Sequence, residues 1–294
     1  MRNKPRQSNF GYLPFVLPAL LLFSLFFFFP MILSMYYSFT NWNGFSQTAK
    51  FNGLANFTLM LEDRSLIKAL KNTLIICVYS ILSFNVLGIG VALLMDLPLR
   101  TRGMLRMLLF LPVMLSAVVV GFVMSYIFSW DGAINRFFEW IGMNFLIHDW
   151  MGNVRTVLST IIVTEVWQSF GFHVIIYLAG LQGIPQDYYE SAMIDGAKFW
   201  RKLWHVTLPL LAPAITINVI LSTIRGIKVF DSVLIMTDGG PGYATQTISL
   251  RIYKEAFVAQ HTGYASAVSL VMFIVIMLIS IVQLRFFRRK ELQM

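Results

Sequence analysis

The chain has 294 residues, of which 57% are hydrophobic and only 13% are charged, with a formal net charge of +9 at neutral pH. Soluble domains average about 25% charged residues, so the composition excludes an ordinary water-soluble domain and favours a bundle of membrane helices. The bases stand at the ends of apolar segments rather than in one stripe, which argues against nucleic acid as a partner.

Six apolar stretches are long enough to cross the hydrocarbon core of a bilayer, which takes about 20 helical residues. In chain order they are 13–36, 74–95, 105–128, 157–181, 210–230 (extending as far as 236) and 265–287. The first stretch is too long for the apolar part of a signal peptide and lacks a small-residue cleavage site, so we expect a retained helix. The sequence therefore predicts an all-α integral membrane protein with six transmembrane helices.

The basic residues predict the orientation of these helices. With a cytoplasmic amino terminus, the inner segments are short and rich in bases, namely Arg2, Lys4, Arg6, Arg100, Arg102, Arg106, Lys198, Arg201, Lys202, Arg285, Arg288, Arg289 and Lys290. The outer segments are longer and carry fewer bases. By the positive-inside rule, both termini and the segment 184–208 lie in the cytoplasm.

Residues 184–208 have the features of a helical hairpin. Pro185 suits the start of a helix, and Asp187 and Glu190 suit its positive end. Gly196 can adopt the left-handed conformation that ends a helix and turns the chain. A second short helix is expected to carry bases on one stripe, as in a helix at a membrane surface, namely Lys198, Arg201, Lys202 and His205. Its aromatic side chains lie on other faces: Phe199, Trp200 and Trp204. Pro209 then begins the fifth span.

This hairpin resembles the cytoplasmic signature of ABC importer permeases, which reads Glu-Ala-Ala, three residues, Gly, nine residues, Ile, any residue, Leu-Pro. The matching positions are Glu190, Ser191 and Ala192, then Gly196, and finally Val206, Leu208 and Pro209, all at the same spacing. Ser191 and Val206 are mild departures, and Asp195 precedes the glycine. The resemblance implies that the hairpin docks on a cytoplasmic ATPase subunit, with Glu190 pairing with a base there, Ala192 allowing close packing and Gly196 making the turn.

Three further segments are similar to permeases for carbohydrate uptake of the maltose and glycerol-phosphate type. They are 13–44, which resembles the first of the two permeases in such systems, 53–74, and 228–257 with its Thr-Asp-Gly-Gly-Pro-Gly run. The resemblance implies a type I ABC importer permease fold, with one transmembrane domain over 1–294 (core roughly 69–287). It also implies a bacterial or archaeal cell membrane as the location.

The same resemblance implies the partners. They are a second, homologous permease subunit in a heterodimer, two cytoplasmic ATPase subunits and an extracytoplasmic solute-binding protein. ATP and Mg²⁺ belong to the ATPase subunits, and no cofactor is expected on this chain.

Polar residues inside the fourth and fifth spans are candidates for substrate contact, because charges at membrane depth are costly. Sugars need hydrogen-bonding groups beside an aromatic ring, a combination that Glu165, Trp167, Gln168 and Ser169 provide. Arg225, Lys228 and Asp231 follow at intervals of three residues along one face of the fifth span. The family resemblance places sugar contacts near five positions: Glu165, Gln168, Ser169, Lys228 and Asp231.

These polar residues have two alternative roles besides substrate contact. Glu165 or Asp231 could pair with Arg225 or Lys228 in a purely structural charge network, or the side chains could lie near the outer surface. Some permeases of this kind hold no substrate site. Asn85 and Asn218 are expected to form hydrogen bonds between helices rather than to act as ligands.

The first functional hypothesis is a non-catalytic permease subunit of an ABC importer for a sugar or oligosaccharide, working by alternating access. An ABC permease for another solute, such as glycerol phosphate, is the nearest alternative. A secondary transporter driven by an ion gradient is disfavoured because no inverted repeats with interrupted helices are evident. A membrane enzyme is disfavoured because no catalytic or metal-ligand arrangement stands at membrane depth, and the four histidines are scattered.

Overall fold

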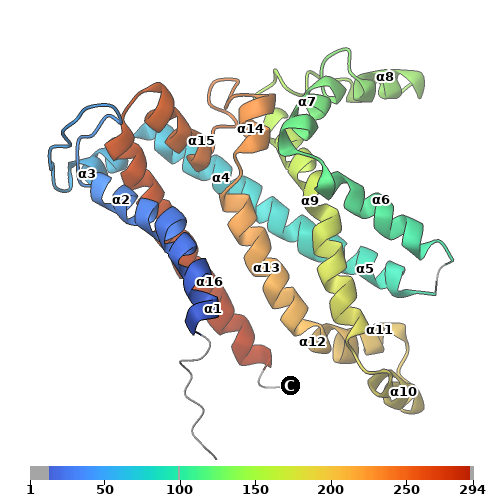
Figure 1. Ribbon diagram of the computed structural model, residues 1–294. Helices are drawn as coiled ribbons and strands as arrows, with labels where there is room; N and C mark the ends of the chain where they lie inside the picture. Colours follow the sequence, from blue (N-terminus) through green and yellow to red (C-terminus); the bar gives the residue numbers. More distant parts are fainter. Residues whose placement is uncertain (1–12, 99, 292–294) are drawn as a thin grey trace, which may run out of the picture. The chain divides into compact units, whose positions relative to one another are not determined.

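The computed structural model describes residues 13–98 and 100–291 (Figure 1). These residues form helices and no β-strand, with one isolated antiparallel bridge between Thr40 and Phe51. In chain order the helices are α1 (Leu13–Phe23), η2 (Ser24–Phe28), α2 (Phe29–Tyr37), α3 (Ala55–Glu62), α4 (Arg64–Leu82), η3 (Ser83–Leu87), α5 (Gly88–Asp96), α6 (Arg102–Met114), α7 (Ala117–Ile127), α8 (Ala133–Trp140), η4 (Asn144–Leu146), α9 (Val157–Gln182), α10 (Gln186–Ile194), α11 (Phe199–Lys202), η5 (Leu203–Thr207), α12 (Leu208–Leu210), α13 (Ala212–Ile227), α14 (Asp231–Met236), α15 (Ile248–Tyr253), η6 (Lys254–Val258) and α16 (Thr262–Glu291).

The chain divides into two compact units, residues 1–62 with 252–271 and residues 63–251 with 272–294. In the first unit, the buried side chain of Asn56 donates to the carbonyl oxygens of Ser38 and Thr40, at 2.8 Å each. The backbone N–H of Gly263 donates to the carbonyl of Trp42 at 2.8 Å. These bonds satisfy the backbone at the end of α2, where the helix stops.

Within residues 13–98 and 100–291, four helical stretches are long and apolar enough to span a membrane, namely Phe15–Tyr37, Arg64–Asp96, Val157–Gln182 and Thr262–Arg288. They coincide with the first, second, fourth and sixth expected spans, and the second begins ten residues earlier than expected, at Arg64. Asp63 explains that start, because its carboxylate accepts hydrogen bonds from the N–H groups of Ser65 and Leu66 and caps the helix.

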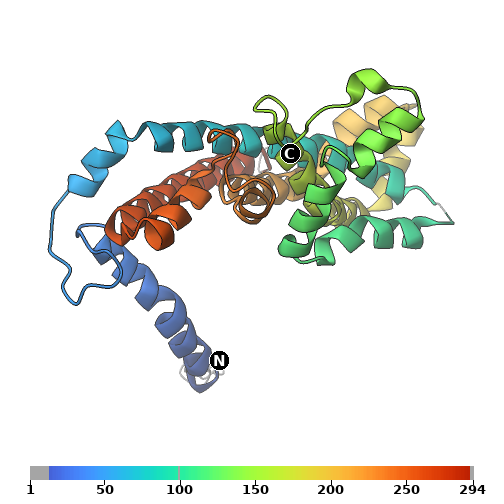
Figure 2. The same ribbon diagram turned by 90° about the horizontal axis from the view of Figure 1, so that it is seen from above.

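The third expected span is not one straight helix. It consists of α6 and α7, which meet at an angle of 99° (green in Figures 1 and 2). Pro112 lacks the N–H that would continue the ladder, and Leu115 and Ser116 take extended conformations before α7 begins. The expected continuous helix over 105–128 is therefore wrong.

The fifth expected span also differs from the expectation. Pro209 does not begin it, because the helix Phe199–Leu210 runs through that proline, and a bend of 67° follows before α13. Pro209 directly follows the π-helical turn η5, where the helix already departs from the regular α-helical hydrogen-bond pattern, and the bend follows two residues later. α13 ends at Ile227, so Arg225, Lys228 and Asp231 do not share one continuous helical face as expected.

Two apolar cores hold the second unit together. One joins α4, α7, α9 and α14 through side chains such as Ile76, Met124, Ile161 and Val233. The other joins α5, α9 and α13 through Ala92, Tyr177, Leu211 and their neighbours. The light-orange α13 passes beside the cyan α4, where Gly226 lies close to the backbone of Cys77 (Figures 1 and 2). Along α9, residues 165–173 lie between the two cores, and there the packing leaves a hollow.

Candidate functional site

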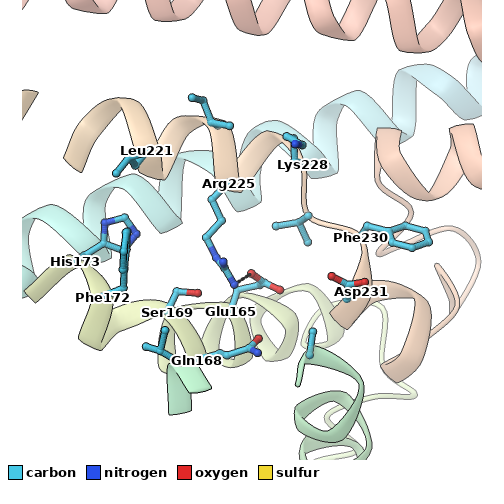
Figure 3. A pocket seen from close by; sticks show the side chains of 14 residues that line it. Glu165, Gln168, Ser169, Phe172, His173, Leu221, Arg225, Lys228, Phe230 and Asp231 are labelled. Atoms are coloured by element: carbon cyan, nitrogen blue, oxygen red, sulfur yellow. Dashed lines mark ion pairs between the residues drawn. The ribbon is translucent and has the colours of Figure 1, made fainter. Parts of the chain in front are cut away.

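A hollow of about 440 Å³ lies between α9 and α13 in the second unit (Figure 3). On α9 its lining residues are Glu165, Gln168, Ser169, Phe172 and His173. On α13 they are Leu221, Ile224 and Arg225, followed by Lys228 just after the end of that helix. Both sets follow helical spacing of three and four residues, so each is one stripe of its helix. Val113 and Ala117 beside the α6–α7 break and Val229, Phe230 and Asp231 before α14 complete the wall.

One ion pair crosses this hollow. The Arg225 guanidinium, at Nη2, lies 3.5 Å from Oε2 of Glu165, and Figure 3 shows the two side chains reaching toward each other from facing helices. The hydroxyl of Ser232 donates to Oε1 of Glu165 at 2.6 Å. Glu165 is buried, whereas the Arg225 side chain is 44% exposed. One of the ion pairs considered from the sequence, Glu165 with Arg225, is thus present.

Gln168 and Ser169 differ in how their polar atoms are satisfied. Nε2 of Gln168 donates to the carbonyl of Leu115 at 3.4 Å, one of the backbone groups that the break between α6 and α7 leaves without a helical partner. Among the described residues, the buried hydroxyl of Ser169 has no hydrogen-bond partner. A buried hydroxyl without a partner costs free energy, so a ligand group that bonded it would remove that cost.

The structure brings five of the six candidate substrate residues to this hollow, and Trp167 is the exception. Trp167 lines a separate apolar depression with Leu87, Leu108 and Phe170, and it is 41% exposed. It follows Glu165 by two residues, about 200° around a helix, which places it on the opposite face. Trp167 is therefore not the aromatic ring beside the polar residues that the sequence suggested.

The aromatic residues of the hollow are Phe172, His173 and Phe230, which the sequence reasoning did not select. Phe172 and His173 continue the stripe of Glu165, Gln168 and Ser169 at helical spacing, so periodicity along α9 could have identified them. No signal of this kind marks Phe230, because it follows the end of α13 and helical spacing does not extend to it.

A polar seam lies deeper between the helices. Nδ1 of His173 lies 2.7 Å from Oδ1 of Asn218, whose Nδ2 donates to the carbonyl of His173 at 3.2 Å. The hydroxyl of Tyr177 donates to Asn85, whose Nδ2 donates to Ser222 at 3.4 Å. Asn85 and Asn218 thus make hydrogen bonds between helices, as expected. Their partners on α9 are His173 and Tyr177, which follow the polar residues Glu165, Gln168 and Ser169 along that helix.

The hairpin consists of α10 and the helical stretch that begins with α11. Gly196 ends α10 with φ +71°, in the left-handed region as expected. The N–H of Ala197 donates to the carbonyl of Ala192 at 2.9 Å, and that of Gly196 to the carbonyl of Met193 at 3.0 Å. This pair of bonds is the Schellman motif, and it satisfies the carbonyls at the end of the helix.

The end of α10 is exposed. Glu190, Ser191, Asp195 and Gly196 are exposed, Ala192 is half-buried, and Ile194 is 87% exposed. Leu208 and Pro209 are half-buried. An apolar Ile beside exposed acids at a tight turn suits a partner surface better than water.

A hydrogen bond joins the two arms of this hairpin. The hydroxyl of Tyr189, next to Glu190, donates to Oγ1 of Thr207 in the π-helical turn η5 at 3.3 Å. Of the four bases expected on one stripe, Lys198 precedes α11 as its N-cap, whereas Arg201, Lys202 and His205 lie within α11 and η5. The wider turn of η5 shifts His205 from its expected place, because a π-helix has more residues per turn.

Residues 85–292 match the family described as "Binding-protein-dependent transport system inner membrane component". The chain belongs to this family. It is therefore a membrane component of a transport system, and membership favours the ABC importer over an ion-driven transporter or an enzyme.

Curated relatives match over nearly their whole length. The chain is 32% identical to a probable starch degradation products transport system permease, AmyD, of Thermoanaerobacterium thermosulfurigenes, covering 98% of this chain and 97% of that one. It is 31% identical to the multiple sugar-binding transport system permease MsmF of Streptococcus mutans, with coverage of 94% and 95%.

The fold is shared with a solved transporter. A bacterial alginate ABC transporter, in complex with a periplasmic protein bound to an alginate pentasaccharide, has a chain that matches with a TM-score of 0.83 at 23% identity, covering 96% of each chain. The expected all-helical type I permease fold is thus confirmed.

Proposed function

We propose that this chain is a permease subunit of an ABC importer and passes a sugar or oligosaccharide across the inner membrane. The observation that carries the proposal is the hollow between α9 and α13, where polar groups face each other inside a bundle of apolar helices. Sugars bury hydroxyl groups that need partners, and the free hydroxyl of Ser169 and the amide of Gln168 offer them. The relatives named for starch degradation products and for multiple sugars support the same substrate class.

The charges of the hollow favour a neutral solute. Its charged lining residues, within the described part of the chain, are two acids and two bases: Glu165, Asp231, Arg225 and Lys228. An anion such as glycerol phosphate is better held by a surplus of positive charge, as in bidentate arginine sites. The balance therefore supports a sugar over glycerol phosphate.

The energy for transport enters at the hairpin in this proposal. Two cytoplasmic ATPase subunits hold ATP and Mg²⁺, and one of them receives the exposed end of α10, with Glu190 pairing with a base. Closure of the ATPase subunits displaces α10, and Tyr189 and the continuous helix Phe199–Leu210 pass the displacement to α13. A second permease completes the pathway, and an extracytoplasmic binding protein delivers the sugar, so that the hollow is exposed to each side in turn.

The test is uptake of labelled maltodextrins into proteoliposomes that contain the complete transport system with ATP inside. Removing the catalytic base of the ATPase should abolish uptake. Uptake that continues without ATP hydrolysis would overturn the ABC assignment, and uptake of glycerol phosphate in place of any sugar would overturn the substrate class.

Glu190→Lys tests the coupling role in the same system. We expect uptake to fall about 30-fold or more, since losing one member of an interfacial charge pair costs about 2 kcal/mol or more. Asp187→Lys is the matched control, because Asp187 is exposed on the same helix but lies outside the signature. Wild-type uptake by Glu190→Lys, with the ATPase subunits still bound, would remove Glu190 from its proposed role.

A further inference from the structure

The short helix α8 lies on the side of the membrane opposite the hairpin in the expected topology, between the third and fourth spans. Figure 1 shows it running across the direction of α9, beyond the end of α7. Its eight residues and the following Ile141 divide into three faces of different chemistry, a pattern that neither the sugar pathway nor ATPase coupling requires.

The first face packs on the protein. Asn135 is buried, and its Nδ2 donates to the carbonyls of Trp130 and His148 at 3.0 and 2.8 Å. Its Oδ1 accepts from the indole N–H of Trp150 at 2.8 Å. Ile134 packs on the apolar core around α7 and α9, and the ring of Phe138 lies beside Trp150. α8 is therefore held in one fixed position.

The second face carries charge, and the third is apolar and exposed. Arg136 and Glu139, three residues apart, are both exposed. Phe137, Trp140 and Ile141 follow the spacing of three and four residues that places side chains on one face, and they are 54%, 82% and 39% exposed. A helix in water would not keep three large apolar side chains together on an exposed face, because that surface remains unburied.

Exposed aromatic side chains also precede α8 in the chain. Phe122 and Tyr126 on α7 and Trp130 just after it are large, exposed side chains. Aromatic residues gather at the level of the lipid headgroups, where their rings are buried and their polar edges stay hydrated. A helix with one face on protein, one in water and one apolar fits that level of the membrane.

We propose that α8 lies flat in the outer headgroup layer of the bilayer, with Phe137, Trp140 and Ile141 inserted among the lipids. Through Trp150, whose carbonyl accepts a hydrogen bond from Thr160 at 3.2 Å, it fixes the outer end of α9 at the membrane surface. Glu165 stands five residues further along α9, so α8 anchors the wall of the hollow.

Spin labels at single cysteines test this proposal. Cys77 is the only cysteine, and Cys77→Ser gives a background with none. Nitroxides are placed at Phe137→Cys and Trp140→Cys on the apolar face, and at Arg136→Cys and Glu139→Cys on the charged face as matched controls. The assembled importer is studied in nanodiscs of phosphatidylethanolamine and phosphatidylglycerol, by collision with oxygen, which partitions into lipid, and with a water-soluble nickel chelate.

We expect an oxygen-to-nickel collision ratio several-fold higher at positions 137 and 140 than at 136 and 139. Equal ratios on the two faces would overturn the proposal, because α8 would then be in water. Low collision with both reagents at 137 and 140 would overturn it in favour of a protein contact, as would protection that develops only when the binding protein is added. Ala133→Cys and Ile141→Cys repeat the measurement if a variant fails to assemble.

Discussion

Gly196 makes the turn of the hairpin, with a left-handed backbone conformation at an exposed position. Its φ of +71° lies in the left-handed region, and a Cβ added there would meet no atom within 4 Å. The requirement for glycine therefore comes from the backbone alone and not from crowding. A turn of this kind sets the direction in which α10 and α11 leave the corner.

Gly196→Ala should weaken association with the ATPase subunits by about five- to thirtyfold, the equivalent of roughly 1–2 kcal/mol of left-handed strain. Gly196→Asn is the control, because Asn adopts this conformation with less strain. Association is measured by titrating the detergent-solubilised permeases with ATPase subunits. Equal effects of Ala and Asn would show that the turn conformation is not what the ATPase requires.

Ser169→Ala separates ligand binding from folding. Because the hydroxyl of Ser169 has no partner among the described residues, its removal should leave the melting temperature unchanged or slightly higher. Uptake at low sugar concentration should fall about fivefold, the equivalent of about 1 kcal/mol for one lost hydrogen bond.

Ser222→Ala is the matched control for that experiment. Ser222 is also fully buried, but its hydroxyl donates to the carbonyl of Val219 at 3.0 Å and accepts from Asn85. Ser222→Ala should therefore lower the melting temperature and leave the dependence of uptake on sugar concentration unchanged. A drop in melting temperature without any change in uptake for Ser169→Ala would contradict the proposed contact.

At the scale of elements, the packing of α6 on α9 depends on one close approach. A Cβ at Gly171 would overlap the carbonyl oxygen of Leu109, a backbone atom that cannot rotate away. The approach brings the last turns of α6 and the following break next to Gln168, which donates to the freed carbonyl of Leu115. The geometry of the third span is thus fixed by its neighbour.

Gly171→Ala should destabilise the protein by about 1–3 kcal/mol through overpacking. Gly90→Ala on α5 is the control, because no atom lies within 4 Å of a Cβ placed there. The alanine also reduces the backbone freedom of the unfolded chain, which should stabilise the folded variant by about 0.4–1 kcal/mol. Thermal unfolding in detergent measures both. Similar melting temperatures for the two variants would mean that α6 can move away from α9 without penalty.

At the scale of the whole molecule, the number of crossings depends on the two bent pairs. In the described part of the chain, four helices are long enough to span alone, and there are six spans if α6–α7 and the bent fifth segment each cross once. Family membership requires a membrane protein, whereas the number of crossings and the side of each loop are predictions from the bases.

Single cysteines in the Cys77→Ser background test the crossings with an impermeant maleimide. Thr101, Asp131 and Ser191 are exposed and lie before α6, after α7 and on α10. In intact spheroplasts Asp131→Cys should react, while Thr101→Cys and Ser191→Cys should react only after permeabilisation. Labelling of Thr101 and Asp131 from the same side would show that α6–α7 is a re-entrant loop.

Much of the site could be predicted from residue type and spacing. The exposed turn at Gly196 and the polar positions 165, 168 and 169 follow from local sequence, because helix caps and helical faces are local properties. The prediction that Trp167 lies beside these polar residues is wrong, because it considered residue type and not the direction in which Trp167 points from α9. Arg225, Lys228 and Asp231 reach the same hollow, although the helix ends between them, a result that spacing alone could not have established.

The sequence by itself determined that the chain is helical, that it belongs in a membrane and where its hairpin turns, since hydropathy, charge and glycine conformation act within a few residues of each position. Only the tertiary structure decided that the third and fifth spans bend and that the hydroxyl of Ser169 faces a hollow without a partner among the described residues. These features depend on which backbone and side-chain groups of distant segments meet. In a medium without water those groups must satisfy one another, so their partners, and not their neighbours in sequence, determine the site.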